Sequence, residues 1–378
     1  MNAAAPSLDL APALVVLPGP KAAVADAAGV RPAGADQARD LFEAGPVLTA
    51  HAAMTARRLG LHAPPRSPRI FDALELFAFT RPARFCAPSA VGLALALGLE
   101  EPRGVVAQAE ALNAACALLL AELARTPEPS REEALAVAET LGRAGWAWGA
   151  AVIAALRAAP VGNQFRTSGL DAWARIPEWE DHAPPGEPGS RPVEAASAAE
   201  RLKALLHRSG LDEARPAQAE FATQAAYAFQ PRDKEGEPRM MLAEAGTGVG
   251  KTLAYLAPAS LWAEANGPAV WVSTYTRALQ RQIERESHAV FPEPKERARR
   301  AVVRKGRENY LCLLNFQDAV NAAQLGGGDL IGLGLAARWA RATRDGDMTG
   351  GDFPAWLPTL FSIGPVAQAS AANLVDRR

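Results

Sequence analysis

Short apolar runs separated by turns dominate the first part of the chain. The runs "ALVVL" (13–17) and "PVLTA" (46–50) are bounded by Pro, Gly or polar residues, which is typical of buried strands. Apolar residues recur at helical spacing in the stretches that follow. This spacing predicts helices over 89–99 and 109–124, and one or two helices over 131–158 with a break near Gly142 or Gly145.

A second alternation of apolar and helical segments follows a stretch rich in Pro and Gly at 177–194, which we interpret as a linker. An apolar run at 240–243 predicts a strand, and 251–265 has a helical pattern that ends at Asn266-Gly267-Pro268. A second predicted strand, "AVWVS" (269–273), precedes a helix that begins at Arg277. Strand, loop, helix, strand and helix in this order are what a parallel sheet requires.

Composition places the chain among globular proteins, because 49% of its 378 residues are hydrophobic and 21% are charged. The net charge of −1 gives no overall signal for nucleic acid. The three cysteines lie too far apart for a disulfide framework, which fits a reducing cytoplasm. The N-terminus is a poor signal peptide, and no run of 18 apolar residues predicts a membrane span.

The segment "AEAGTGVGKT" fits the phosphate-binding loop between a strand and a helix, with Ala245 in the first glycine position. Glycines let the backbone turn tightly and aim its N–H groups at phosphates, and the following helix directs its positive end at the same anion. A lysine reaches the β- and γ-phosphates, and a hydroxyl binds Mg²⁺. The predicted nucleotide-binding residues are Ala245, Gly246, Thr247, Gly248, Val249, Gly250, Lys251 and Thr252, with Lys251 and Thr252 as the catalytic pair and Thr252 as the metal ligand.

The segments "ARPAQ", "EAGTGVGKTLAYLAPA", "VSTYTRALQRQ" and "KGRENYLC" together resemble the N-terminal part of a DinG-type ATP-dependent DNA helicase of superfamily 2. The resemblance covers about residues 200–378. It implies a RecA-like motor fold, ATP and Mg²⁺ as cofactors, and single-stranded or forked DNA as the partner. Protein partners stay open.

The resemblance also assigns roles to residues outside the loop. Arg215 and Gln218 would belong to the motif that reads the adenine edge, where an amide can both donate and accept. The DNA-binding positions would be Thr274, Thr276, Arg277 and Gln280. Residues 277–308 support DNA contact with ten basic and five acidic side chains, a net of +5 in a chain whose total is −1. A solvated charged face is the alternative.

Cys312 follows "KGRENYL", where the resembling family places the first ligand of an iron–sulfur cluster. The alternative is a buried thiol. A [4Fe–4S] cluster needs four thiolates, and no cysteine follows Cys312, so the cluster is expected only in the full-length protein. The Asp-Glu-Ala-His box and the second RecA-like domain of the family are also absent. We therefore expect an N-terminal fragment that is inactive alone.

The first block vaguely resembles a DnaQ-type 3′–5′ exonuclease domain in "PVLTAHAAMTARRLGL" and "RIFDALELFAF". Two-metal hydrolysis needs several carboxylates, and this block lacks them at the family's positions. Thr55 stands where an Asp is expected, and Gln108 and Asn113 occupy the spacing of a His and an Asp. His51 and Asp72 are predicted to be structural.

The expected fold class is α/β, with a degenerate exonuclease-like domain and an incomplete RecA-like nucleotide-binding domain with a parallel sheet. The predicted domains are 10–125 (exonuclease-like), 126–197 (helical connector and linker), 198–310 (partial motor domain) and 311–378 (start of an iron–sulfur domain). The predicted function is the ATP-binding part of a DNA helicase. The alternatives are a non-catalytic, nucleotide-switched interaction or DNA-binding module and, less favoured, an unrelated phosphate-loop kinase.

Overall fold

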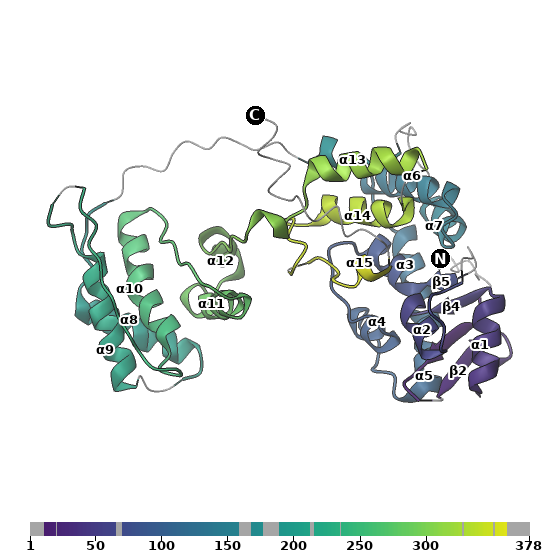
Figure 1. Ribbon diagram of the computed structural model, residues 1–378, viewed down its shortest axis with the longest axis horizontal. Coiled ribbons are helices and arrows are strands. Elements are labelled where there is room, and N and C mark those ends of the chain that lie inside the picture. Colours follow the sequence, from purple (N-terminus) through teal and green to yellow (C-terminus); the bar gives the residue numbers. More distant parts are fainter. Residues whose placement is uncertain are drawn as a thin grey trace, which may run out of the picture. The chain divides into compact units, whose positions relative to one another are not determined.

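The chain forms two compact units in the computed structural model (Figure 1), whose described residues are 11–19, 21–65, 70–158, 168–176, 189–211, 215–234, 236–326, 329–350 and 352–360. The first unit comprises the described residues of 1–178 and 306–378, and the second comprises those of 179–305. Most of the predicted linker (177–188) and the tail 361–378 lie outside the described residues.

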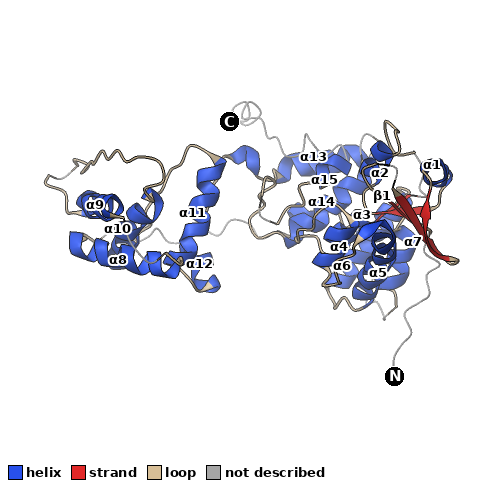
Figure 2. Ribbon diagram, turned by 90° about the horizontal axis from the view of Figure 1, so that it is seen from below, coloured by secondary structure: helices blue, strands red, loops and turns tan. Residues whose placement is uncertain are grey.

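The first unit contains a five-stranded mixed sheet in the order β3-β2-β1-β4-β5, drawn red in Figure 2. The first three strands form an antiparallel meander, whereas β1–β4 and β4–β5 are parallel pairs. Helices α1 (Ala35–Ala44) and α2 (Ala52–Arg58) make the parallel crossovers. The strands are β1 (Ala13–Val16), β2 (Ala22–Asp26), β3 (Gly29–Ala33), β4 (Val47–Thr49) and β5 (Ile70–Asp72). The sheet confirms the α/β class and both strands predicted in this block.

Alternate residues of the strands enter two separate cores, because side chains of a strand point to opposite faces in turn. Leu14 and Val16 pack with Phe42 of α1 and Ala56 of α2. Ala13, Val15, Ala23 and Ala25 face the larger core, which contains the long helix α5 (Gly104–Ala124). Helices therefore cover both faces of the sheet.

The larger core also holds the helices predicted as a connector, so these helices belong to the first unit and do not form a separate segment. α3 (Ala73–Thr80) starts directly after β5, and α4 (Ala90–Ala96) precedes α5. The predicted break near Gly142 separates α6 (Ser130–Arg143) from α7 (Gly149–Leu156). Trp148 anchors α7, because its Nε1 donates to the Asp72 carbonyl at 2.7 Å.

α5 is the one helix among the described residues that is long and apolar enough to cross a membrane. In the structure its buried stripe, which includes Leu112, Cys116 and Leu119, packs in the larger core. A core helix of this kind passes the same test of length and composition.

The chain returns to the first unit after residue 305. Following a short 3-10 turn, η3 (Arg307–Asn309), the helices α13 (Leu313–Gln324), α14 (Leu330–Ala342) and α15 (Leu357–Leu360) join the larger core. Phe316 lies against Trp173, in the 3-10 turn η1 (Ala172–Ala174), with ring centroids 5.9 Å apart. The Arg338 guanidinium donates twice to the Phe79 carbonyl, and Trp356 donates to the Cys86 carbonyl. The described residues of 311–378, predicted as the start of a separate domain, thus share a core with α3 and α6.

The second unit is a group of helices around α10 (Lys251–Asn266). α8 (Ala195–Arg208), α9 (Pro216–Ala225) and α11 (Arg277–Val290) pack on α10 through Leu202, Leu205, Ala222, Ala254 and Val290. The 3-10 turn η2 (Ala226–Phe229) extends α9, and α12 (Pro294–Arg300) follows α11. The helices predicted at 251–265 and from Arg277 are confirmed.

The strands predicted at 240–243 and 269–273 are wrong, because neither segment joins a ladder in the structure. A strand requires a neighbour to satisfy its backbone N–H and C=O groups. Both segments lie on the surface of the unit: Leu242 is 95% exposed and Trp271 is 83% exposed. Apolar composition alone identified the segments but could not supply a pairing partner.

Phe316→Ala tests whether α13 belongs to the core of the first unit. Phe316 is fully buried, so its truncation should lower the free energy of unfolding by about 3–5 kcal/mol. Leu314→Ala, on the same helix but 49% exposed, is the matched control and should change it by less than about 0.5 kcal/mol. Urea unfolding followed by tryptophan fluorescence measures both, and equal effects of the two variants would contradict the shared core.

Candidate functional site

The predicted phosphate loop lies at the start of α10, and its backbone turns through two left-handed glycines. Gly248 has φ +78° and Gly250, the N-cap of α10, has φ +86°. These values favour glycine over any other residue. A side chain at Gly250 would also require Gln218 to move, because a Cβ would lie 2.3 Å from Nε2 of Gln218.

Lys251 and Thr252 lie in the first turn of α10. The Lys251 ammonium donates to the carbonyls of Ala245 and Gly246, both at 2.8 Å, so it curls back over its own loop. Thr252 is buried, and its Oγ1 accepts from Nε2 of Gln282 at 3.2 Å. A cation, loop N–H groups and a hydroxyl at the positive end of one helix form a donor set that fits a nucleotide phosphate with Mg²⁺.

Arg215 and Gln218 contact the same loop from α9. Arg215 Nη1 donates to the Gly248 carbonyl at 2.5 Å, and the buried Gln218 donates from Nε2 to the Gly250 carbonyl at 3.0 Å. Pro216 begins the helix between them. The structure thus brings both predicted residues to the loop, where they hold its backbone. Their predicted role in adenine recognition stays a prediction. Of the remaining loop positions, Thr247 is exposed and Val249 is half-buried.

The four predicted DNA-binding positions lie together where the chain enters α11. Thr276 is the N-cap of α11, and its side chain accepts from the backbone N–H of Leu279 at 3.2 Å. Arg277 is the first residue of the helix, and Gln280 is half-buried in its first turn. The Thr274 hydroxyl is buried without a hydrogen-bond partner. Farther along, the basic run 295–307 includes α12, whose Arg299 is exposed.

Sequence reasoning missed Gln282 and Glu286, which lie one turn apart on the face of α11 that contacts α10. Gln282 Nε2 donates to Thr252 and, at 2.7 Å, to Oε1 of Glu286. Burial raises the pKa of the half-buried Glu286 carboxyl. Gln282 and Glu286 are four residues apart, and the buried Ala289 and Val290 follow at helical spacing. This pattern indicates a helix face that points inward. That signal does not reveal which residue of α10 the face meets.

The predicted cluster ligand Cys312 lies in the first unit, as the N-cap residue of α13, and is half-buried. Burial raises the pKa of Cys86 to about 12 and also raises that of Cys116, which disfavours the thiolate that binds metal. Among the described residues no three His, Cys, Asp or Glu side chains form a group that could hold a metal ion. The assignment of Cys312 stays a prediction.

His51 and Asp72 both cap helices, the structural role expected for them. His51 Nδ1 accepts from the N–H of Met54 at the start of α2, and burial lowers the pKa of His51. The Asp72 carboxylate accepts from Ala52 N at 2.7 Å and from Leu74 N at 2.9 Å. Burial raises the pKa of Asp72 to about 7. The neighbouring Glu75, which accepts from Nε1 of Trp146, also has a raised pKa, first through burial and then through repulsion by Asp72.

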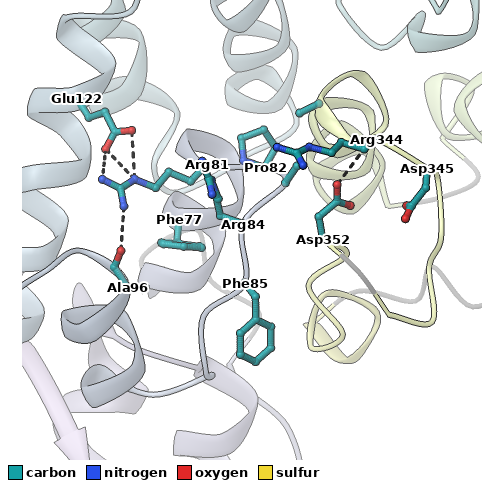
Figure 3. Close-up of a pocket in the computed structure, with 12 residues that line it drawn as sticks. Phe77, Arg81, Pro82, Arg84, Phe85, Ala96, Glu122, Arg344, Asp345 and Asp352 are labelled. Carbon is teal, nitrogen blue, oxygen red and sulfur yellow. Dashed lines mark hydrogen bonds and ion pairs between the residues drawn. The ribbon is translucent and has the colours of Figure 1, made fainter. Parts of the chain in front are cut away.

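A cavity of about 1050 Å³ lies in the first unit, and its lining includes Arg81, Glu122 and Asp352 (Figure 3). Its charged lining is mostly partnered within the protein. Arg81 is bound by Glu122 and the Ala96 carbonyl, and Asp352 accepts from Trp339, Thr343 and the backbone of Arg344. The cavity contains none of the predicted site residues.

Comparison with known proteins places similarity around the loop and α11. Residues 216–314 match the DEAD/DEAH box helicase family. The chain is 38% identical over 117 residues to the ATP-dependent helicase DinG of Mycobacterium tuberculosis, covering 29% of this chain and 16% of that protein. It is 36% identical over 131 residues to the ATP-dependent DNA helicase YoaA of Escherichia coli, covering 33% and 19%.

A shorter match joins the chain to the 3′-5′ exonuclease DinG of Bacillus subtilis, at 38% identity over 84 residues, which is 21% of this chain and 9% of that protein. No solved structure matches. The aligned part of the chain spans less than a fifth of the length of each of these relatives.

The buried carboxyl pair predicts that the first unit loses stability as pH rises. A carboxyl whose pKa is raised by folding holds its proton in the folded state after the unfolded chain has lost it. The stabilisation from Asp72 is complete below about pH 3.8 and is lost as pH rises through about 7. Urea unfolding between pH 4 and 8 measures this slope.

Glu75→Gln should flatten the slope, because the amide keeps an acceptor for Trp146 but removes one buried carboxyl and its repulsion on Asp72. Glu110→Gln, at an exposed position of α5, is the matched control and should leave the slope unchanged. A wild-type unit that gains stability from pH 4 to 7 would contradict the prediction.

Proposed function

We propose that the second unit is the nucleotide-binding part of an ATP-dependent DNA helicase, because residues 216–314 match the DEAD/DEAH box helicase family and the chain is similar to DinG-type helicases. The observation that carries the proposal is the loop geometry. Two left-handed glycines, a lysine and a buried threonine meet at the start of one helix. We propose helicase activity only for a longer protein that contains this segment, and for the given chain we propose nucleotide and DNA binding.

The loop would bind the phosphates through groups that the structure already brings together. The Lys251 ammonium would leave the carbonyls of Ala245 and Gly246 and bind phosphate oxygens instead. This exchange is favourable because the ammonium and the phosphate are both charged. The N-terminus of α10 would add its partial positive charge. Thr252 would hold Mg²⁺, which neutralises phosphate charge when bound.

Arg215 and Gln218 would keep the loop in this conformation while the nucleotide binds. Both donate to carbonyls of left-handed glycines, which prevents these carbonyls from turning toward the phosphates. Their remaining donor and acceptor atoms would meet an adenine edge, as the resemblance implies.

The N-terminal sheet supports the proposal of an exonuclease-like scaffold without the metal chemistry. The ends of the parallel strands β4 and β5 carry Thr49 and Asp72, and the Asp72 carboxylate is buried and already accepts two backbone N–H groups. Two-metal hydrolysis would require carboxylates open to an ion. We therefore propose that the first unit has a docking or scaffolding role.

An iron–sulfur cluster is proposed only for the longer protein. Cys312 is half-buried at the start of α13, and the described residues bring no other thiol to it. The test of this assignment is to measure the iron and sulfide content of that longer protein and of its Cys312→Ser variant.

Lys251→Ala tests the nucleotide site. Loss of a charge-assisted contact to phosphate should weaken ATP binding by about 1.5–3 kcal/mol, which is about ten- to a hundredfold in affinity. Lys203→Ala, which removes an exposed lysine from the neighbouring helix α8, is the control and should bind like the wild type. Titration with a fluorescent ATP analogue measures both, and unchanged affinity of Lys251→Ala would refute the phosphate loop.

Salt titration tests the DNA proposal. Binding to an oligothymidine should weaken steeply with salt, because each phosphate contact contributes about −0.7 to the slope of log K against log salt concentration. Replacing both Arg299 and Arg304 by Ala should make the slope shallower by about 1.4, since both are exposed in the basic run. Arg125→Ala in the first unit is the control. Fluorescence anisotropy gives the affinities, and a flat salt dependence would exclude a phosphate-backbone contact.

A further inference from the structure

α11 has two different faces. One lies against the helix that carries the proposed nucleotide site, and the other is exposed to solvent, where we propose that DNA binds. Gln282, Glu286, Ala289 and Val290 turn toward the neighbouring helices, and the last two are buried in the core with α8 and α10. The opposite face exposes side chains to solvent. These exposed residues are Arg281, Glu284, Arg285 and His288.

The inward face reaches the proposed metal ligand through one side chain. Gln282 Nε2 donates to Thr252 Oγ1 at 3.2 Å and to Glu286 Oε1 at 2.7 Å. An ionised carboxylate only accepts hydrogen bonds, so Glu286 fixes the nitrogen of the Gln282 amide on the side of Thr252. The Glu286 carboxylate also faces the backbone N–H of Leu253. Gln282 is thus held in one orientation by partners on both helices.

The contact at Thr252 uses the same oxygen that the proposed site offers to a cation. An amide N–H and a divalent cation both present positive charge to Oγ1, so the hydrogen bond from Gln282 and coordination by Thr252 disfavour each other. Occupation of the site would release the Gln282 amide from α10. The C-terminal end of α11 would stay in place, because Ala289 and Val290 are buried and Arg208 donates to the Ala289 carbonyl at 3.1 Å.

We infer that Gln282 is a positioning residue that couples Mg²⁺–nucleotide binding at the loop to single-stranded DNA binding by α11. The inference rests on the proposed function. Release of Gln282 frees the N-terminal turns of α11, which begin at Arg277 and carry Arg281, to adjust to DNA phosphates. Mg²⁺–nucleotide therefore strengthens DNA binding, and DNA strengthens Mg²⁺–nucleotide binding by the same factor, as linkage requires.

The test measures that factor with the 378-residue chain. Oligothymidine affinity is determined by anisotropy with and without a non-hydrolysable ATP analogue, once with Mg²⁺ and once with EDTA. The wild type should bind the oligothymidine about three- to tenfold more tightly with Mg²⁺ and analogue, the effect of about one hydrogen bond. The factor should be near one in EDTA, because metal-free nucleotide leaves Thr252 with Gln282.

Gln282→Ala and Gln282→Met should bring the factor near one in Mg²⁺. The methionine keeps the length of the side chain and its packing, so a folding defect in the alanine variant cannot imitate this result. Gln224→Ala, an exposed glutamine of α9, is the matched control and should keep the wild-type factor.

The outcomes separate this inference from the proposed function. A wild type that binds both ligands with a factor near one, or variants that keep the wild-type factor, would overturn the role of Gln282 alone. A factor below one in the wild type would overturn it as well. Absence of any nucleotide binding would overturn the proposed function and the coupling together.

Discussion

The contact between Gln218 and the left-handed Gly250 is the constraint on which the second unit depends. It joins α9 to the residue just before the first turn of α10, where a Cβ would lie 2.3 Å from Nε2 of Gln218. Because Gly250 is also the N-cap of α10, the same contact fixes the direction of the helix and the place where its free N–H groups point. Lys251 and Thr252 follow directly, so their positions depend on that junction.

The polar groups of the loop have hydrogen-bond partners within the protein. The Lys251 ammonium has two carbonyls, the Thr252 hydroxyl has an amide, and the glycine carbonyls have Arg215 and Gln218. The partners of Lys251 are neutral carbonyls of the loop, and the other partners lie on the neighbouring helices α9 and α11. A phosphate can replace the two carbonyls at Lys251, because a hydrogen bond between two charged groups is stronger than one from a charged group to a neutral carbonyl.

Sequence reasoning succeeded where a few adjacent residues determine the structure. The loop and the starts of α10 and α11 were predicted, because glycine conformation and helix-start signals depend on adjacent residues. The hairpin of β2 and β3 was not predicted, because "AAVADAAGVRPA" is rich in alanine and has only two β-branched residues, Val24 and Val30. The conformation of segment 269–273 and the contact made by Gln282 of α11 depend on partners that are distant in sequence. Spacing along the chain does not identify these partners.

The path of the chain has a consequence for the stability of the second unit. Residues 179–305 are inserted between two parts of the first unit, since the chain leaves its core after α7 and the turn at Trp173 and returns to it with Phe316. As long as the first unit is folded, an unfolded second unit is a loop closed at both ends. Closure removes conformational entropy from that unfolded loop, worth about 4–5 kcal/mol for a cross-link spanning roughly a hundred residues. The packing of α13 in the core of the first unit therefore stabilises the second unit by holding one end of the inserted chain.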